Sequence, residues 1–116
     1  MTQYTPDAWV IVRFSKAGEV TDKILSGWYG GYLGGDSWRI SSGITKIEDD
    51  GEFYRITNHS GSVYTCHKRL EKMSGIMASQ YDLWVSMVGE QADVDDQDRI
   101  SVEIVDASEC IAKYCS

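Results

Sequence analysis

The sequence is poor in the residues that mark secreted, membrane-bound or proline-rich proteins. Its 116 residues include one proline, three cysteines and two histidines. No apolar run approaches the roughly 20 residues that a membrane-spanning helix needs, and the N-terminus lacks the basic and then apolar segment of a secretion signal. We therefore expect a soluble, cytoplasmic protein that makes no contact with a membrane.

The cysteines are too few for a disulfide framework. Cys66, Cys110 and Cys115 are odd in number, which favours free thiols in a protein without a secretion signal. A zinc site built from these thiols would have to include His67 beside Cys66, and adjacent ligands are geometrically awkward. We expect neither a metal nor another cofactor.

Apolar and aromatic side chains, in contrast, are plentiful. Hydrophobic residues make up 42% of the chain, which also holds four tryptophans and seven tyrosines. This is enough apolar surface to offset the entropy lost on folding, so the chain is not expected to be disordered. Its length predicts a single domain over residues 1–116, large enough to be stable without a metal or a disulfide.

Acidic side chains are concentrated in one part of the chain. Residues 73–116 hold nine acids against two bases, which accounts for the whole net charge of −7, whereas residues 1–36 sum to −1 and residues 37–72 to +1. This asymmetry indicates either an electrostatic binding face or a solvated surface that keeps the protein soluble. The predicted acidic face consists of Glu90, Asp93, Asp95, Asp96, Asp98, Glu103 and Asp106.

The hydrophobic pattern predicts an α+β fold in which a twisted antiparallel sheet packs against one long amphipathic helix. The near-continuous apolar run at residues 8–14 predicts a central strand buried on both faces. Residues 20–29 fit either a short helix or a strand. Further short strands, which would form a meander, are predicted at residues 38–40, 44–48, 53–57 and 62–66, with an Asp-Gly hairpin turn at Gly51.

The long helix is predicted over residues 70–88, because its apolar residues recur every three or four positions. Gly75 falls inside this range at a cost of about 1 kcal/mol relative to alanine, and Gly89 is a plausible end. An acidic connection at residues 90–99 and a strand at 100–105 follow. Residues 107–116 are predicted to be a final helical turn or a frayed end.

A glycine-rich run at residues 30–35 suggests a second binding surface. The run lacks the lysine of a phosphate-binding P-loop and the spacing of a dinucleotide-binding fingerprint. Its amides could still cradle an anionic ligand, or the run could be a tight turn that lets aromatic residues pack. The predicted aromatic and glycine-rich patch consists of Trp28, Tyr29, Tyr32, Trp38, Arg39, Arg55 and Lys68.

Catalysis and nonspecific nucleic-acid binding find less support. Cys66 and His67 are neighbours on a predicted strand and should point to opposite faces, while His59 and His67 stand at the two ends of that strand. We therefore predict no catalytic residues. The most basic segment carries a charge of only +1, so nonspecific binding to phosphate backbones should be weak.

Four segments of the chain resemble small uncharacterised proteins of large tailed bacteriophages. They are AWVIV at residues 8–12, WYGGYLGGDSW at 28–38, SSGI at 41–44 and SGSVYTCHK at 60–68. The resemblance extends from residue 8 to about residue 77 and excludes the acidic residues from Asp93 onward. It implies a protein made in an infected bacterium, where small non-enzymatic chains often bind and block a host or defence component.

Three functional hypotheses follow. The preferred one is a binding inhibitor whose acidic face or aromatic patch occupies a host or defence macromolecule, including one that itself binds nucleic acid. The alternative is a module that sequesters a nucleotide signal with the glycine-rich run and nearby Arg or Lys. The third is a small enzyme that uses His59, His67 or Cys66.

Overall fold

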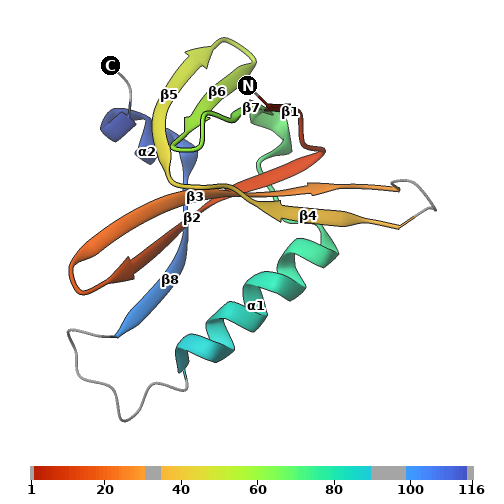
Figure 1. The fold of residues 1–116 in the computed structure, drawn as a ribbon. Coiled ribbons are helices and arrows are strands. Elements are labelled where there is room, and N and C mark those ends of the chain that lie inside the picture. Colours follow the sequence, from red (N-terminus) through yellow and green to blue (C-terminus); the bar gives the residue numbers. More distant parts are fainter. Residues whose placement is uncertain (1, 31–34, 90–98, 115–116) are drawn as a thin grey trace.

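The computed structural model describes residues 2–30, 35–89 and 99–114, which form strands and two helices (Figure 1). The elements in chain order are β1 (Gln3–Tyr4), β2 (Ala8–Lys16), β3 (Glu19–Trp28), β4 (Ser37–Ile40), β5 (Ile44–Asp50), β6 (Phe53–Asn58), β7 (Val63–His67), α1 (Gly75–Gly89), β8 (Ile100–Val105) and α2 (Ala107–Tyr114). A short 3-10 turn at Lys68–Leu70 follows β7. The α+β class is therefore confirmed.

The described strands form two sheets rather than the single sheet that was predicted. The central sheet has the order β4-β3-β2-β8 and is entirely antiparallel, whereas in the outer sheet, of order β1-β7-β6-β5, β1 runs parallel to β7. The predicted meander is correct for β5, β6 and β7. It is wrong for β4, which pairs with β3 instead of β5.

The chain changes sheets at Ser41. Its backbone amide still donates to the Ile24 carbonyl (3.0 Å), as a further residue of β4 would. The Ile24 amide, however, donates to the Ser41 hydroxyl (2.8 Å) instead of to a backbone carbonyl. The serine side chain thus satisfies the β3 backbone where β4 ends, which lets the chain turn away to begin β5 in the outer sheet.

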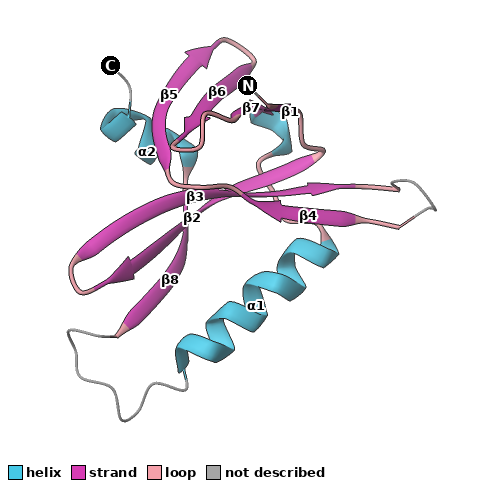
Figure 2. Ribbon diagram, in the orientation of Figure 1, coloured by secondary structure: helices cyan, strands magenta, loops and turns pink. Residues whose placement is uncertain are grey.

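The central sheet separates two hydrophobic cores, because side chains of β2 alternate between its faces. Trp9 and Ile11 pack toward the outer sheet and α2, whereas Val10 and Val12 pack toward α1. All four are buried. Figure 2 shows α1 and α2 on opposite sides of this sheet. The prediction of a central strand buried on both faces is confirmed for β2.

The prediction of one long helix over residues 70–88 is not confirmed. The described helices are α1 and α2, with 15 and 8 residues. α1 begins later than predicted because Ser74 caps it: the Met77 amide donates to the Ser74 hydroxyl (3.4 Å). Leu70 packs in the core on the other side of the sheet. No described helix has the length and apolar character needed to cross a membrane.

Capping by Ser74 also changes the position of Gly75, which becomes the first helical residue rather than an interior one. The close approach of α1 to the sheet occurs instead at Gly27 in β3. A methyl group added there would lie 2.5 Å from the Met77 sulfur and 3.0 Å from the Ser74 hydroxyl oxygen. Gly27 therefore fixes the N-terminal half of α1 against β3. The segment at residues 20–29, for which helix and strand remained open, is a strand as far as Trp28, where β3 ends.

The predicted C-terminal turn is the helix α2, which a buried carboxylate holds to the central sheet. Asp22 lies opposite Arg13 in the β2–β3 pair, and its Oδ1 accepts a hydrogen bond from the Arg13 Nε (2.8 Å). Its Oδ2 accepts one from the Tyr114 hydroxyl (2.6 Å) and lies 3.6 Å from the Lys113 Nζ. Asp22 is only 1% exposed.

The environment of Asp22 sets its protonation. Burial alone would raise the pKa of this carboxyl, but hydrogen bonds from Arg13 and Tyr114 and the two nearby positive charges outweigh burial and hold the pKa below its ordinary value. The carboxylate stays ionised. Burial, together with the same contact with Asp22, raises the pKa of the Tyr114 phenol, so Tyr114 remains a donor.

Candidate functional site

An apolar cleft opens between the C-terminal half of α1 and the strands β2 and β8. Its volume is about 320 Å³. The residues that line it are Phe14, Trp84, Met87, Val88, Ile100 and Val102. Phe14 and Val102 are register partners in adjacent strands, so β2 and β8 present one continuous apolar floor to α1. None of the described lining residues carries a charge, and the cleft is suited to an apolar group.

Trp84 of α1 is the centre of an aromatic cluster beside the cleft. Its ring meets the Phe14 ring edge to face, with centroids 5.4 Å apart, and meets the Trp38 ring in the same manner at 6.0 Å. Edge-to-face pairs of this kind add stability beyond the area they bury. The cluster joins β2, β4 and α1 into one surface and leaves Trp38 partly exposed.

Exposed apolar side chains gather around the same elements. Among the described residues, six of the eight large hydrophobic side chains that are exposed lie on β4, α1 or β8. These six are Trp38, Leu83, Val85, Met87, Ile100 and Ile104. We call them, together with the cleft, the apolar face. A group of exposed apolar side chains in one region of a small protein is a common feature of interaction surfaces.

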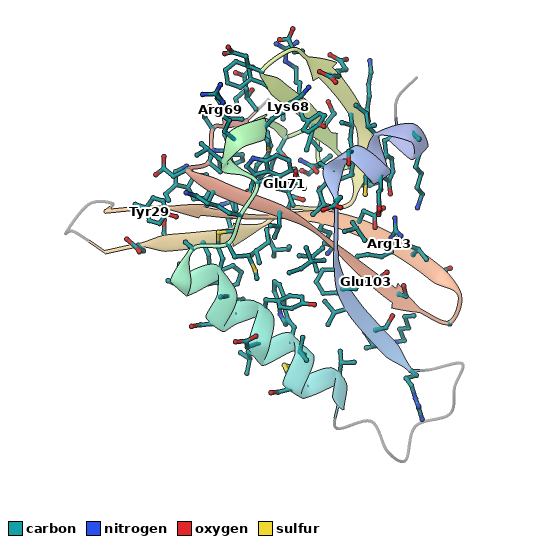
Figure 3. All side chains as sticks on the ribbon, turned by 180° about the vertical axis from the view of Figure 1, so that it is seen from behind. Arg13, Tyr29, Lys68, Arg69, Glu71 and Glu103 are labelled. Carbon is teal, nitrogen blue, oxygen red and sulfur yellow. The ribbon has the colours of Figure 1, made fainter. Side chains whose placement is uncertain are left out.

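The structure describes only two of the seven residues of the predicted acidic face. Glu90, Asp93, Asp95, Asp96 and Asp98 lie outside the described residues. In the chain they join α1 to β8, the two elements that supply Val88 and Ile100 to the cleft. Glu103 and Asp106 are exposed, and Figure 3 shows Glu103 beside Arg13. Glu103 alternates with Val102 along β8 and so points away from α1.

The predicted aromatic and glycine-rich patch does not form one surface. Trp38 faces α1, whereas Trp28 lies on the other face of the central sheet, 6.1 Å from the Tyr4 ring. Tyr29 is exposed at the end of β3, distant from Lys68 in Figure 3, and Tyr32 lies outside the described residues. Within the glycine run, the described Gly30 amide already donates to Asp36 Oδ1 (3.0 Å).

The three cationic residues of that patch are also separated. Arg55 pairs with Asp50 (3.1 Å) and Glu48 (3.7 Å) on the outer sheet. Lys68 pairs with Asp49 (2.8 Å), and this hydrogen bond raises the pKa of the ammonium group. The charges of Arg55 and Lys68 are therefore partly neutralised by acids of β5. Arg39 stands apart, with its guanidinium 4.8 Å from the centre of the Tyr4 ring.

The residues proposed for a small enzyme are not brought together. Cys66 is fully buried, and burial raises the pKa of its thiol, which disfavours the nucleophilic thiolate. His67 accepts a hydrogen bond from the Arg69 amide at Nδ1 (3.1 Å) and packs edge to face on Phe53. His59 stands in the turn at the opposite end of the β6–β7 pair. The described residues contain no group of three His, Cys, Asp or Glu side chains that could hold a metal.

The spacing of the apolar residues in α1 predicts a buried stripe and does not identify the exposed apolar residues. The apolar stripe that recurs every three or four positions includes Tyr81, Trp84 and Val88 in this half of the helix. Leu83, Val85 and Met87 fall between these positions. Their presence makes the second half of α1 apolar on more than one side. A helix that is apolar on all sides is normally covered on all sides, and this is the signal that could have identified the apolar face.

Comparisons with known proteins do not assign the chain to a family. No family model matches it, and no match is found among curated proteins or solved structures. The functional proposals below therefore depend on the residues of this chain and on their geometry.

Proposed function

We propose that the protein acts without catalysis, by binding a partner protein through the apolar face and blocking it. The observation that carries this proposal is the concentration of exposed apolar side chains around the cleft between α1 and β8. Protein interfaces commonly have an apolar centre with aromatic anchors and a polar rim. Trp84 and Trp38 would be such anchors, and the cleft would receive an apolar side chain of the partner.

The charge of the chain supports a partner that is basic around an apolar centre. The acids at residues 90–98 join the two elements of the cleft, and the third of the chain from residue 73 carries the whole net charge. Complementary charge raises the association rate and disfavours wrong partners. A surface that binds nucleic acid is basic. In the setting that the bacteriophage resemblance implies, the partner would be such a host or defence protein, inhibited by occupation of that surface.

Two valines allow a closely matched test of the apolar face. Val85 on α1 and Val20 on β3 are both 44% exposed, but Val20 belongs to the set of β3 side chains that points away from α1. The partner would first be captured from a bacterial lysate with the immobilised protein, identified, and purified. Binding of wild type, Met87→Glu, Val85→Glu and Val20→Glu would then be measured by surface plasmon resonance.

We expect Met87→Glu to weaken binding at least tenfold, about 1.4 kcal/mol, because Met87 lines the cleft. Val85→Glu should weaken binding less, and Val20→Glu should leave it unchanged. Rising salt should slow association of the wild type. Equal affinities for all four proteins would remove the apolar face from the proposal, and a salt-independent rate would remove the acidic residues.

A further inference from the structure

A second cavity, of about 270 Å³, lies on the other side of the central sheet from the apolar face and is polar. It opens where β1, the end of β4, and the loops on either side of β5 and β6 meet. Its polar lining includes Tyr4, Arg39, Ser42, Ser60, Ser62 and Tyr64. None of the described residues that line it is acidic. The cavity thus offers a cation and several hydroxyl groups without a carboxylate that would repel an anion.

Arg39 brings a positive charge to this cavity that no acid neutralises within the described chain. Arg13 and Arg55 each form an ion pair, with Asp22 and with Asp50, but Arg39 has no carboxylate within 4.0 Å among the described residues. Its guanidinium is positioned instead by the Tyr4 ring, 4.8 Å away. Stacking of this kind fixes the plane of the guanidinium. One N–H group is hydrogen-bonded to the Tyr64 hydroxyl, and the remaining N–H groups can bind an oxyanion.

The three serines form a chain of hydrogen bonds that leaves one hydroxyl hydrogen unused. The Ser42 hydroxyl donates to the Ser60 hydroxyl (3.1 Å) and accepts from the Ser60 amide (3.1 Å). The Ser60 and Ser62 hydroxyls lie 3.1 Å apart, and either can be the donor. Only one of the two hydroxyl hydrogens can lie between these oxygens, so the second hydroxyl hydrogen has no acceptor within the described residues. It is available to a ligand.

The tyrosine and the loop contacts make the cavity a defined site. Tyr64 is buried, and burial raises the pKa of its phenol, although the nearby charge of Arg39 opposes the rise; Tyr64 therefore remains protonated. The two serine-bearing loops are joined by a hydrogen bond from the His59 amide to the Gly43 carbonyl (2.7 Å). Asn58 holds Ser62 in place through its Nδ2 (3.2 Å). The donors are thus positioned before a ligand arrives.

We propose that this cavity binds the phosphate group of a small phosphorylated molecule. Arg39 supplies the charge and the fork of donors that matches phosphate oxygens, and the Ser60–Ser62 pair supplies a further donor. Its volume is slightly below the range of about 300–1,000 Å³ that is usual for ligand pockets, so the cavity fits the phosphate group and a few neighbouring atoms, and the rest of a larger molecule would lie outside it. The site is separate from the apolar face.

Isothermal titration calorimetry and thermal unfolding with inorganic phosphate, adenosine monophosphate and adenosine test this assignment. We expect phosphate and the monophosphate to bind and to raise the Tm by several degrees at saturation, and adenosine to do neither. Arg39→Gln should weaken phosphate binding at least tenfold. The matched control is Arg55→Gln, which removes another exposed arginine outside the cavity and should bind as the wild type does.

A second variant distinguishes the loss of a ligand contact from a change in the fold caused by Arg39→Gln. Ser60→Ala removes a hydroxyl without changing charge, and we expect it to weaken binding several-fold with an unchanged Tm in the absence of ligand. Binding of adenosine as strong as that of the monophosphate would overturn the assignment, because the nucleoside would then be the recognised group. So would an absence of phosphate binding, or equal binding by the Arg39→Gln and Arg55→Gln variants.

Discussion

The two faces of the central sheet are covered to different extents. On one face, the outer sheet and α2 enclose Trp9, Ile11 and Ile24 completely and surround the carboxylate of Asp22 with partners. On the other, α1 and the preceding Met73 cover Val10 and Val12 and leave a cleft with exposed apolar side chains around it. Because β2 and β3 contribute to both faces, the difference comes from the covering layers. One face is closed, and the other leaves apolar side chains exposed.

The largest effect should come from Asp22, which tests whether the enclosed face stabilises the molecule. Asp22→Asn leaves the positive charges of Arg13 and Lys113 without their buried partner. We expect a loss of about 3 kcal/mol in the free energy of unfolding, at the lower end for a broken buried ion pair because Arg13 is partly exposed. Urea unfolding measures it. The control Asp50→Asn, which alters an exposed pair, should cost under about 1 kcal/mol.

Gly27 tests how firmly α1 is held on the open face. Gly27→Ala places a methyl group 2.5 Å from the Met77 sulfur, so the buried methionine or the start of α1 must move. We expect a loss of about 2 kcal/mol. Gly35→Ala meets no atom within 4 Å and serves as the control in the same urea unfolding series. An unchanged stability for Gly27→Ala would mean that α1 shifts freely and that the cleft has no fixed shape.

The pH dependence of stability tests whether Asp22 is ionised on the enclosed face. The pKa of Asp22 is lowered by folding, so its stabilisation is complete above the ordinary pKa of 3.8 and is lost as the pH falls through the lower, folded value. The stability difference between wild type and Asp22→Asn should therefore be constant from pH 7 to 5 and should narrow below about pH 4. Unfolding at a series of pH values gives this difference. A gap that is unchanged at pH 2 would contradict the ionised state of Asp22.

The smallest effect is expected on the open face itself. Leu83→Lys places a charge on an exposed position of α1, where surface substitutions typically change stability by no more than about 0.5 kcal/mol. Thermal unfolding measures the change. A marked destabilisation would show that Leu83 already packs against other parts of the chain, and the apolar face would then be a core surface rather than a binding surface.

Much of the fold could be predicted because it depends on local patterns. The apolar run of β2 predicts a buried central strand, and the Asp50-Gly51 turn has the positive φ (78° at Gly51) that glycine accepts readily. The start of α1 was missed because periodicity extends back to Leu70, whereas the Ser74 cap decides where the helix begins. The partition into two sheets was missed because alternation identifies strands but not their partners.

The candidate sites were harder to predict because they combine distant segments. The cleft draws on β2, α1 and β8, and the polar cavity joins Arg39 to serines that lie in two later loops. The division of the aromatic patch, however, could have been predicted. Trp38 and Arg39 are neighbours on one strand, so they must point to opposite faces by the alternation that also separates Cys66 from His67.

The hydrogen bond between Tyr114 and Asp22 also constrains how the protein can form during its synthesis. The two residues are 92 positions apart, and β8, which pairs along the edge of β2, is likewise a late segment of the chain. Until β8 has left the ribosome, one edge of β2 lacks its neighbour, and until residue 114 has left it, the Asp22 carboxylate lacks the tyrosine. The enclosed face can therefore close only after residues 1–114 have been made, which excludes stepwise completion of this core from its N-terminal strands.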